Sequence, residues 1–162
     1  LEANFGPIGT IIGHPPCTYL TNSGVCHLNT DPGRWEKLDE AAAFFKALFE
    51  APIPFIALEN PIMHKYAVER TGAGKATQYV QPWMFGHTEQ KATGLWLKGL
   101  LPLQETNNVK EEMMQLPVNQ RQRLHYLPPS PDRWKIRSTT YQGIADAFAM
   151  QWGGQVTERN AA

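Results

Sequence analysis

The sequence predicts an α/β fold in which a mostly parallel sheet is flanked by helices. Two apolar runs, Thr10-Ile11-Ile12 and residues 54–58, have the length and composition of buried strands. Residues 31–51 lie between them and have the apolar spacing of an amphipathic helix. A strand, helix and strand in succession indicate a right-handed parallel βαβ unit.

The helix between the two strands is the clearest element of the pattern. Asp31-Pro32-Gly33 is a suitable cap and first turn, and Ala51-Pro52 marks the end. Apolar side chains recur between these points at alternating spacings of three and four, namely Trp35, Leu38, Ala42, Phe45 and Phe49. This face should pack on the sheet.

The remaining elements are less clearly marked in the sequence. We expect a short helix over residues 62–70, strands over residues 78–82 and 94–97, a helical piece around residues 110–116, and a final helix over residues 139–152. The polar, proline-bounded stretch 100–131 is interpreted as an excursion from the sheet. Residues 1–162 are therefore interpreted as one domain.

Composition narrows the class of protein. Of the 162 residues, 42% are hydrophobic and 19% charged, which is typical of a globular chain rather than a disordered one. Fifteen basic residues balance fifteen acidic ones, which removes the bulk signal for nucleic-acid binding but leaves room for a local basic stripe. No apolar run approaches the roughly 20 residues of a membrane span, so no membrane partner is expected. Two cysteines are too few for a disulfide framework, and a cytoplasmic location is the simplest expectation.

A cysteine follows the first predicted strand. Pro15 and Pro16 remove two backbone donors and restrict φ, so the chain leaves the strand in a rigid loop that ends at Cys17. A rigid loop of this kind holds a nucleophilic sulfur in one position. His14 lies near enough in sequence to help hold a thiolate. The alternative is a buried cysteine beside a turn.

A carboxylate follows the second predicted strand. Glu59 is succeeded by Asn60-Pro61, which enforces a stiff, extended exit. Because ligands bind outside the carboxyl ends of strands in open α/β sheets, Glu59 and Cys17 form a candidate chemical pair. A carboxyl group there can protonate or hydrogen-bond a ring nitrogen. The alternative is a solvated strand end.

Three further groups of residues carry weaker signals. His14, Cys17, Cys26 and His27 include zinc-ligand types, but adjacent ligands at 26 and 27 have poor geometry, so no metal site is assigned. Residues 72–75, Gly-Ala-Gly-Lys, lack the full spacing of a phosphate loop and are better interpreted as a helix end and turn. A basic segment interleaved with Tyr126 and Trp134 fits either a nucleic-acid contact or a solvated face. Its basic members are Arg121, Arg123, Arg133, Lys135 and Arg137.

The ordered motifs resemble those of DNA cytosine-5 methyltransferases, and more closely those of small phage and prophage proteins related to these enzymes. The resemblance covers most of residues 14–152. The matching stretches are His14-Pro-Pro-Cys-Thr-Tyr-Leu, Glu59-Asn-Pro-Ile-Met-His, Gln81-Pro-Trp-Met-Phe-Gly-His, Lys91-Ala-Thr-Gly-Leu-Trp-Leu-Lys and Pro128-Pro-Ser-Pro-Asp-Arg-Trp. It implies a Rossmann-like methyltransferase fold, present in part.

The resemblance also implies roles for particular residues. Cys17 would add to C6 of a flipped-out cytosine, and Glu59 would contact the base. The substrate-binding residues would be Pro16, Asn60, Lys91 and Thr93. Thr18 stands where these enzymes usually have glutamine, and Pro61 where they have valine.

The resemblance further implies S-adenosylmethionine as methyl donor and DNA as partner. In the family the donor is held by a glycine-rich turn and an acidic residue that precede the cysteine strand, and this chain has only sixteen residues before Cys17. We therefore expect an N-terminally truncated catalytic half with its cofactor-binding residues unassigned. Two function classes follow: a cytosine-5 methyltransferase-like enzyme, or a non-catalytic remnant or nucleic-acid-binding module that keeps the fold. A third, weaker option is another use of the cysteine, on free nucleotides or a metal.

Overall fold

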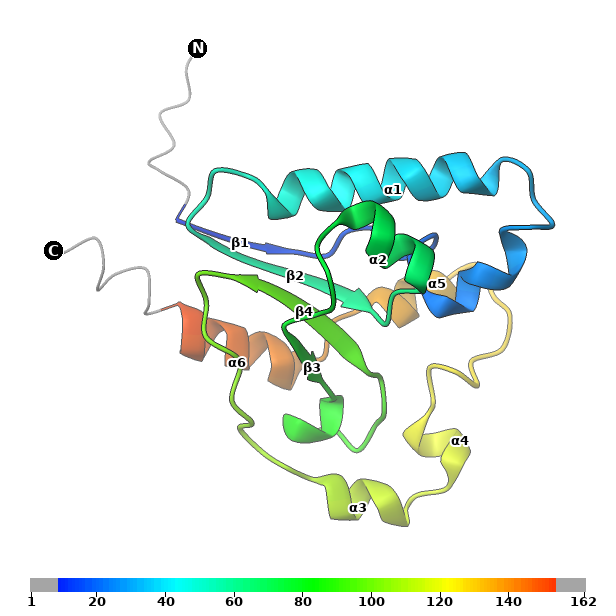
Figure 1. Cartoon of the computed structure of the whole chain (residues 1–162). Helices are drawn as coiled ribbons and strands as arrows, with labels where there is room; N and C mark the ends of the chain where they lie inside the picture. Colours follow the sequence, from blue (N-terminus) through cyan, green and yellow to red (C-terminus); the bar gives the residue numbers. More distant parts are fainter. Residues whose placement is uncertain (1–8, 154–162) are drawn as a thin grey trace, which may run out of the picture. The chain divides into compact units, whose positions relative to one another are not determined.

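The computed structural model describes residues 9–153, which fold as two compact units (Figure 1). The first contains residues 9–79 and 93–102, and the second contains residues 80–92 and 103–153. No helix in this described part is long and apolar enough to cross a membrane.

A four-stranded mixed sheet organises the fold, in the order β1-β2-β4-β3. The strands are β1 (Thr10–Gly13), β2 (Phe55–Pro61), β3 (Gln78–Val80) and β4 (Thr93–Lys98). β1 runs parallel to β2, whereas β4 runs antiparallel to it. The predicted α/β class is confirmed, but a mostly parallel, Rossmann-like sheet is not. A run of apolar residues indicates burial and not strand direction, so the sequence did not reveal the reversal of β4.

The core of the first unit lies between the sheet and α1 (Arg34–Phe49). Leu38, Ala42 and Phe45 of α1 are buried in one cluster with apolar side chains of β2 and β4. The ring of Phe45 meets that of Trp96 edge to face at 5.3 Å between centroids. The expected apolar face of residues 31–51 is thus the face that packs.

Shorter helices complete the first unit. The helix α2 (Lys65–Thr71) packs beside α1 and ends at Gly72, whose φ of 63° is the left-handed conformation that favours glycine. A 3₁₀ helix, η1 (Asn22–His27), follows the cysteine loop. Residues 72–75 thus follow the end of α2, as the sequence predicted, with Gly72 as the cap of the helix.

The second unit is mostly helical. Its elements are η2 (Pro82–Met84), α3 (Lys110–Gln115), α4 (Val118–Arg121), α5 (Arg133–Ser138) and α6 (Gln142–Trp152). Buried apolar side chains of α6 include Ile144, Phe148 and Trp152, and the last two stack with centroids 4.8 Å apart. The helices α3 and α6 agree with expectation, whereas α4 and α5 were not anticipated.

Candidate functional site

The chain segments that carry Cys17 and Glu59 are neighbours. β1 and β2 pair in parallel with Gly13 opposite Leu58, so both chains continue from the same edge of the sheet (Figure 1). Glu59 is the next residue of β2, and Cys17 follows four residues after Gly13 in a partly exposed loop. The two strands are adjacent as expected, but Glu59 is not at a strand end. β2 continues through Asn60 to Pro61, and Glu59 pairs with Leu95, because β4 extends the sheet beyond Leu58.

Hydrogen bonds tie the cysteine loop to the segment that follows β2. The Nδ2 of Asn60 donates to the carbonyl oxygen of Pro15 at 3.3 Å, and the backbone amide of His64 donates to that of Leu20 at 3.0 Å. Inside the loop, the carbonyl oxygen of Cys17 accepts from the amides of Leu20 and Thr21 at 3.1 and 3.2 Å. The cysteine is thus held in a tight turn that is fastened to the carboxylate segment.

Glu59 lies beside His14. The Oε2 of Glu59 is 3.1 Å from Nδ1 of His14, and the two side chains are 11% and 47% exposed respectively. The sequence indicated that His14 could help hold a thiolate at Cys17, and the structure shows its contact with the carboxylate of Glu59. A largely buried carboxyl group thus faces a half-exposed imidazole.

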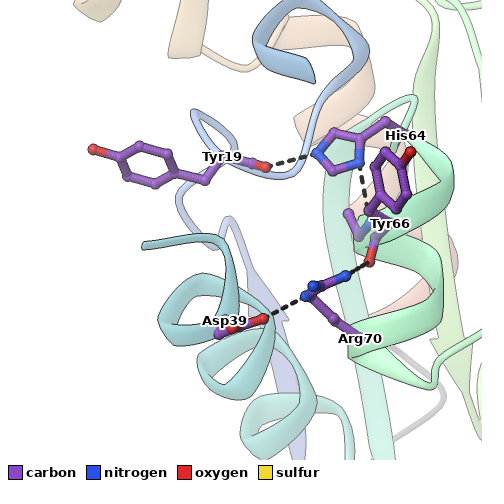
Figure 2. A network of polar contacts seen from close by, with 6 residues as sticks. Tyr19, Asp39, His64, Tyr66 and Arg70 are labelled. Atoms are coloured by element: carbon purple, nitrogen blue, oxygen red, sulfur yellow. Dashed lines mark hydrogen bonds and ion pairs between the residues drawn. The ribbon is translucent and has the colours of Figure 1, made fainter. Parts of the chain in front are cut away.

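His64 is a residue of the site that sequence reasoning missed. It is 3% exposed, and Figure 2 shows its ring between the cysteine loop and the start of α2. Its Nε2 is 2.9 Å from the carbonyl oxygen of Tyr19, and its Nδ1 accepts from the amide of Ala67 at 3.1 Å. Because Nδ1 accepts an N–H, the proton of the neutral ring is on Nε2 and is donated to Tyr19. The signal was a histidine directly before a helix, in the N-cap position.

The four residues expected to bind substrate differ from one another in burial and in the unit to which they belong. Pro16 is exposed, whereas Asn60 is fully buried, and its Oδ1 has no hydrogen-bond partner among the described residues. Thr93 is buried on β4 opposite Pro61. Lys91 belongs to the second unit, where its Nζ is 5.9 Å from the ring centroid of Tyr141.

Three of the five residues in the predicted basic segment contact other groups of the second unit through their guanidinium groups. Arg123 pairs with Glu89 at 3.1 Å, Arg121 donates to the carbonyl oxygen of Met114, and Arg133 donates to that of His125. Lys135 and Arg137 are exposed on α5. Trp134 lies between them and Arg133 in sequence and is 72% exposed. Trp134, Lys135 and Arg137 therefore form an exposed aromatic and basic stretch on α5.

Glu89 also holds Tyr141, whose hydroxyl donates to its Oε2 at 2.7 Å. Burial, followed by this hydrogen bond and the negative charge of Glu89, raises the pKa of Tyr141 far above its ordinary range. Nearby, a shallow pocket of about 340 Å³ is lined by Gln81, Gln90, Ala92, Gln122 and His125. Glu89 thus joins Tyr141 and Arg123 within the second unit.

Comparison with protein-family models and with curated proteins found no match to this chain. Residues 9–153 contain no group of three or more histidine, cysteine, aspartate or glutamate side chains arranged to hold a metal ion. In the first unit, Cys17 and Glu59 lie on neighbouring segments, one after β1 and the other within β2.

Proposed function

We propose that this chain carries the nucleophile and the base-holding carboxylate of a DNA cytosine-5 methyltransferase-type reaction. One observation carries the proposal: Cys17 and Glu59 extend from adjacent parallel strands, and Asn60 fastens the cysteine loop to the carboxylate segment. A partly exposed thiol and a mostly buried carboxyl group on rigid mounts suit attack on a planar base.

In this mechanism Cys17 is the nucleophile. A cytosine out of the stack presents C6 to the thiolate of Cys17, and the Sγ–C6 bond forms as the C5–C6 double bond opens. The electron pair moves toward N3, which takes a proton from the carboxyl group of Glu59. His14, at 3.1 Å from Glu59, can then return a proton to the carboxylate and recover one from solvent.

The described residues do not fit S-adenosylmethionine. A glycine-rich nucleotide-binding turn follows a strand and opens a helix, whereas Gly72 and Gly74 close α2 and precede β3. The chemistry proposed for residues 9–153 is therefore the addition of Cys17 to the base, without transfer of a methyl group.

The second candidate is a non-catalytic nucleic-acid-binding module. The exposed Trp134, Lys135 and Arg137 of α5 favour it, because an aromatic side chain beside cations can stack on a base next to phosphates. This candidate requires binding of nucleic acid without any bond to Cys17.

The deciding experiment uses an oligonucleotide pool in which 2-pyrimidinone replaces cytosine in otherwise random sequence. This base is more electrophilic at C6 than cytosine, so addition does not require a methyl donor. We expect a protein–oligonucleotide adduct in denaturing gels that is abolished by Cys17→Ser and strongly reduced by Glu59→Gln. Cys26→Ser is the matched control, because Cys26 is exposed and lies in η1 of the same unit. Binding without an adduct would overturn the catalytic proposal in favour of the module.

A further inference from the structure

Two cations of α1 lie over the ring of Tyr19, two residues after Cys17. The Cζ of Arg34 is 5.1 Å from the ring centroid, and the Nζ of Lys37 is 5.9 Å from it. Residues three apart in a helix lie on the same face, so both side chains reach the cysteine loop from one side of α1. The structure thus places two positive charges against the turn that holds the candidate nucleophile.

The guanidinium group of Arg34 lies where the backbone of Gly24 comes close to the carbonyl oxygen of Thr18. Its Nη2 donates to the carbonyl oxygen of Thr18 at 3.4 Å. A Cβ atom at Gly24 would lie 2.8 Å from this Nη2 and 2.7 Å from the Thr18 oxygen. Glycine at position 24 therefore leaves room for the guanidinium group of Arg34. This group lies between Gly24, the carbonyl oxygen of Thr18 and the ring of Tyr19.

The charge of this pair is not neutralised by the described residues. No ion pair between Arg34 or Lys37 and a carboxylate occurs in residues 9–153, and the buried Nε of Arg34 lacks a hydrogen-bond partner there. Asp31, the nearest acidic residue before α1, instead accepts from the amide of Gly33 at 3.2 Å. A seated guanidinium group with spare donors beside an ammonium group is suited to a phosphate.

We propose that Arg34 and Lys37 form a phosphate-binding site that holds a phosphate group of the substrate beside Cys17. The placement of this phosphate next to the reacting base rests on the proposed function. The phosphate belongs either to a nucleic-acid strand or to a free nucleotide, and both present the same oxygen acceptors. Tyr19 supports the two cations through the face of its ring.

Binding measurements on this chain test the site. The anisotropy of a fluorescent, single-stranded, cytosine-containing oligonucleotide pool is followed over a range of salt concentrations for Arg34→Gln, Lys37→Gln and the parent chain. We expect each substitution to weaken binding several-fold at low salt. The slope of log K against log salt should fall by about 0.7 for each phosphate that the variant no longer binds.

Two further variants keep the result interpretable. Lys46→Gln is the matched control, because Lys46 lies on the same helix and pairs with Glu50 at 3.8 Å instead of with the loop; its slope should equal that of the parent. Arg34→Lys retains the charge but lacks the planar guanidinium group that donates to Thr18, and it should weaken binding less than Arg34→Gln does. Lys37 is exposed, so Lys37→Gln tests the site even if the other variants unfold.

The source of the phosphate is resolved by protection of Cys17 from iodoacetamide. Protection by deoxycytidine 5′-monophosphate, but not by deoxycytidine, identifies a free nucleotide as the phosphate source. Protection by the oligonucleotide pool alone identifies a strand. In both cases Lys37→Gln should diminish the protection. Equal protection by deoxycytidine and its monophosphate would overturn the site.

The outcome also separates this site from the proposed function. An adduct at Cys17 together with unchanged salt slopes in Arg34→Gln and Lys37→Gln would leave the proposed function standing and overturn the phosphate site. Reduced slopes without any adduct would support the phosphate site and overturn the catalytic proposal.

Discussion

Asn60 donates a hydrogen bond to the carbonyl oxygen of Pro15, a residue 45 positions earlier in the chain. This buried bond is one of several that join the cysteine loop to the segment of the carboxylate, among them the bond from the His64 amide to the carbonyl oxygen of Leu20. Together these bonds keep the two segments in one defined arrangement. The arrangement bears on both the stability of the chain and the reactivity of Cys17.

Asn60→Ala should destabilise the chain and disorder the cysteine loop. Loss of the amide leaves the Pro15 carbonyl without this donor, at a cost of about 1 to 3 kcal/mol in the free energy of unfolding. Urea unfolding measures this cost, and Asn29→Ala, at an exposed position near η1, is the control with little expected change. Equal stability of the two variants would show that the buried bond contributes nothing.

His64 variants should separate its two hydrogen bonds. His64→Asn retains an N-cap acceptor for α2 but loses the donor to Tyr19, whereas His64→Ala loses both. We expect His64→Ala to be less stable than His64→Asn by about 1 kcal/mol in urea unfolding. Both should alter the alkylation rate of Cys17 relative to that of Cys26. A normal rate in both would contradict a positioning role for the ring.

Cys17→Ser should leave the free energy of unfolding nearly unchanged, within about 0.5 kcal/mol. The reason is that the side chain is partly exposed and is not part of the buried core. Iodoacetamide should modify Cys17 in the native chain, with Cys26 as the internal reference. A large loss of stability, together with no alkylation, would identify Cys17 as a packing residue.

Tyr141 should make stability fall at alkaline pH. Its pKa is raised by burial and by Glu89, so the folded phenol stays protonated where the unfolded phenol, with a pKa of about 10, ionises. This contribution is complete below about pH 10 and declines as the pH rises above it. Tyr141→Phe should remove this decline and cost about 1.5 kcal/mol at neutral pH, because the bond to Glu89 is removed.

The control for this titration is Tyr126→Phe, since Tyr126 is 55% exposed. Absorbance of tyrosinate against pH should show one late-ionising tyrosine in the parent chain that is missing only from Tyr141→Phe. A late titration that survives this substitution would assign the effect to another tyrosine.

Much of the local structure was predictable because it depends on short-range pattern. The apolar spacing over residues 31–51 anticipated α1 (Arg34–Phe49), and the runs before Cys17 and Glu59 anticipated β1 and β2. Prolines and glycines near these runs marked where the elements end. The adjacency of β1 and β2 followed from one helix connecting two parallel strands.

The partners of individual side chains were not predictable in this way. The sequence left Arg123 open between a nucleic-acid contact and a solvated face, and the structure shows its pairing with Glu89, 34 residues earlier. The sequence placed His14 near enough to Cys17 to help hold a thiolate, and the structure shows its contact with Glu59. The partner of a charged or polar side chain depends on which distant segments pack beside it. Local sequence patterns therefore do not predict that partner.

The sequence by itself determined where β1 and β2 lie and that Cys17 and Glu59 are close to them in the chain, since strand and turn propensities act over a few positions. It did not determine that β2 continues past Glu59 to Pro61, because those residues pair with the distant strand β4. Only the tertiary structure decided that β4 runs antiparallel to β2, that His64 bridges to Tyr19, and that Arg34 and Lys37 meet over one ring. These features require segments far apart in the chain to pack together. Packing of that kind is set by the whole core and not by any one segment.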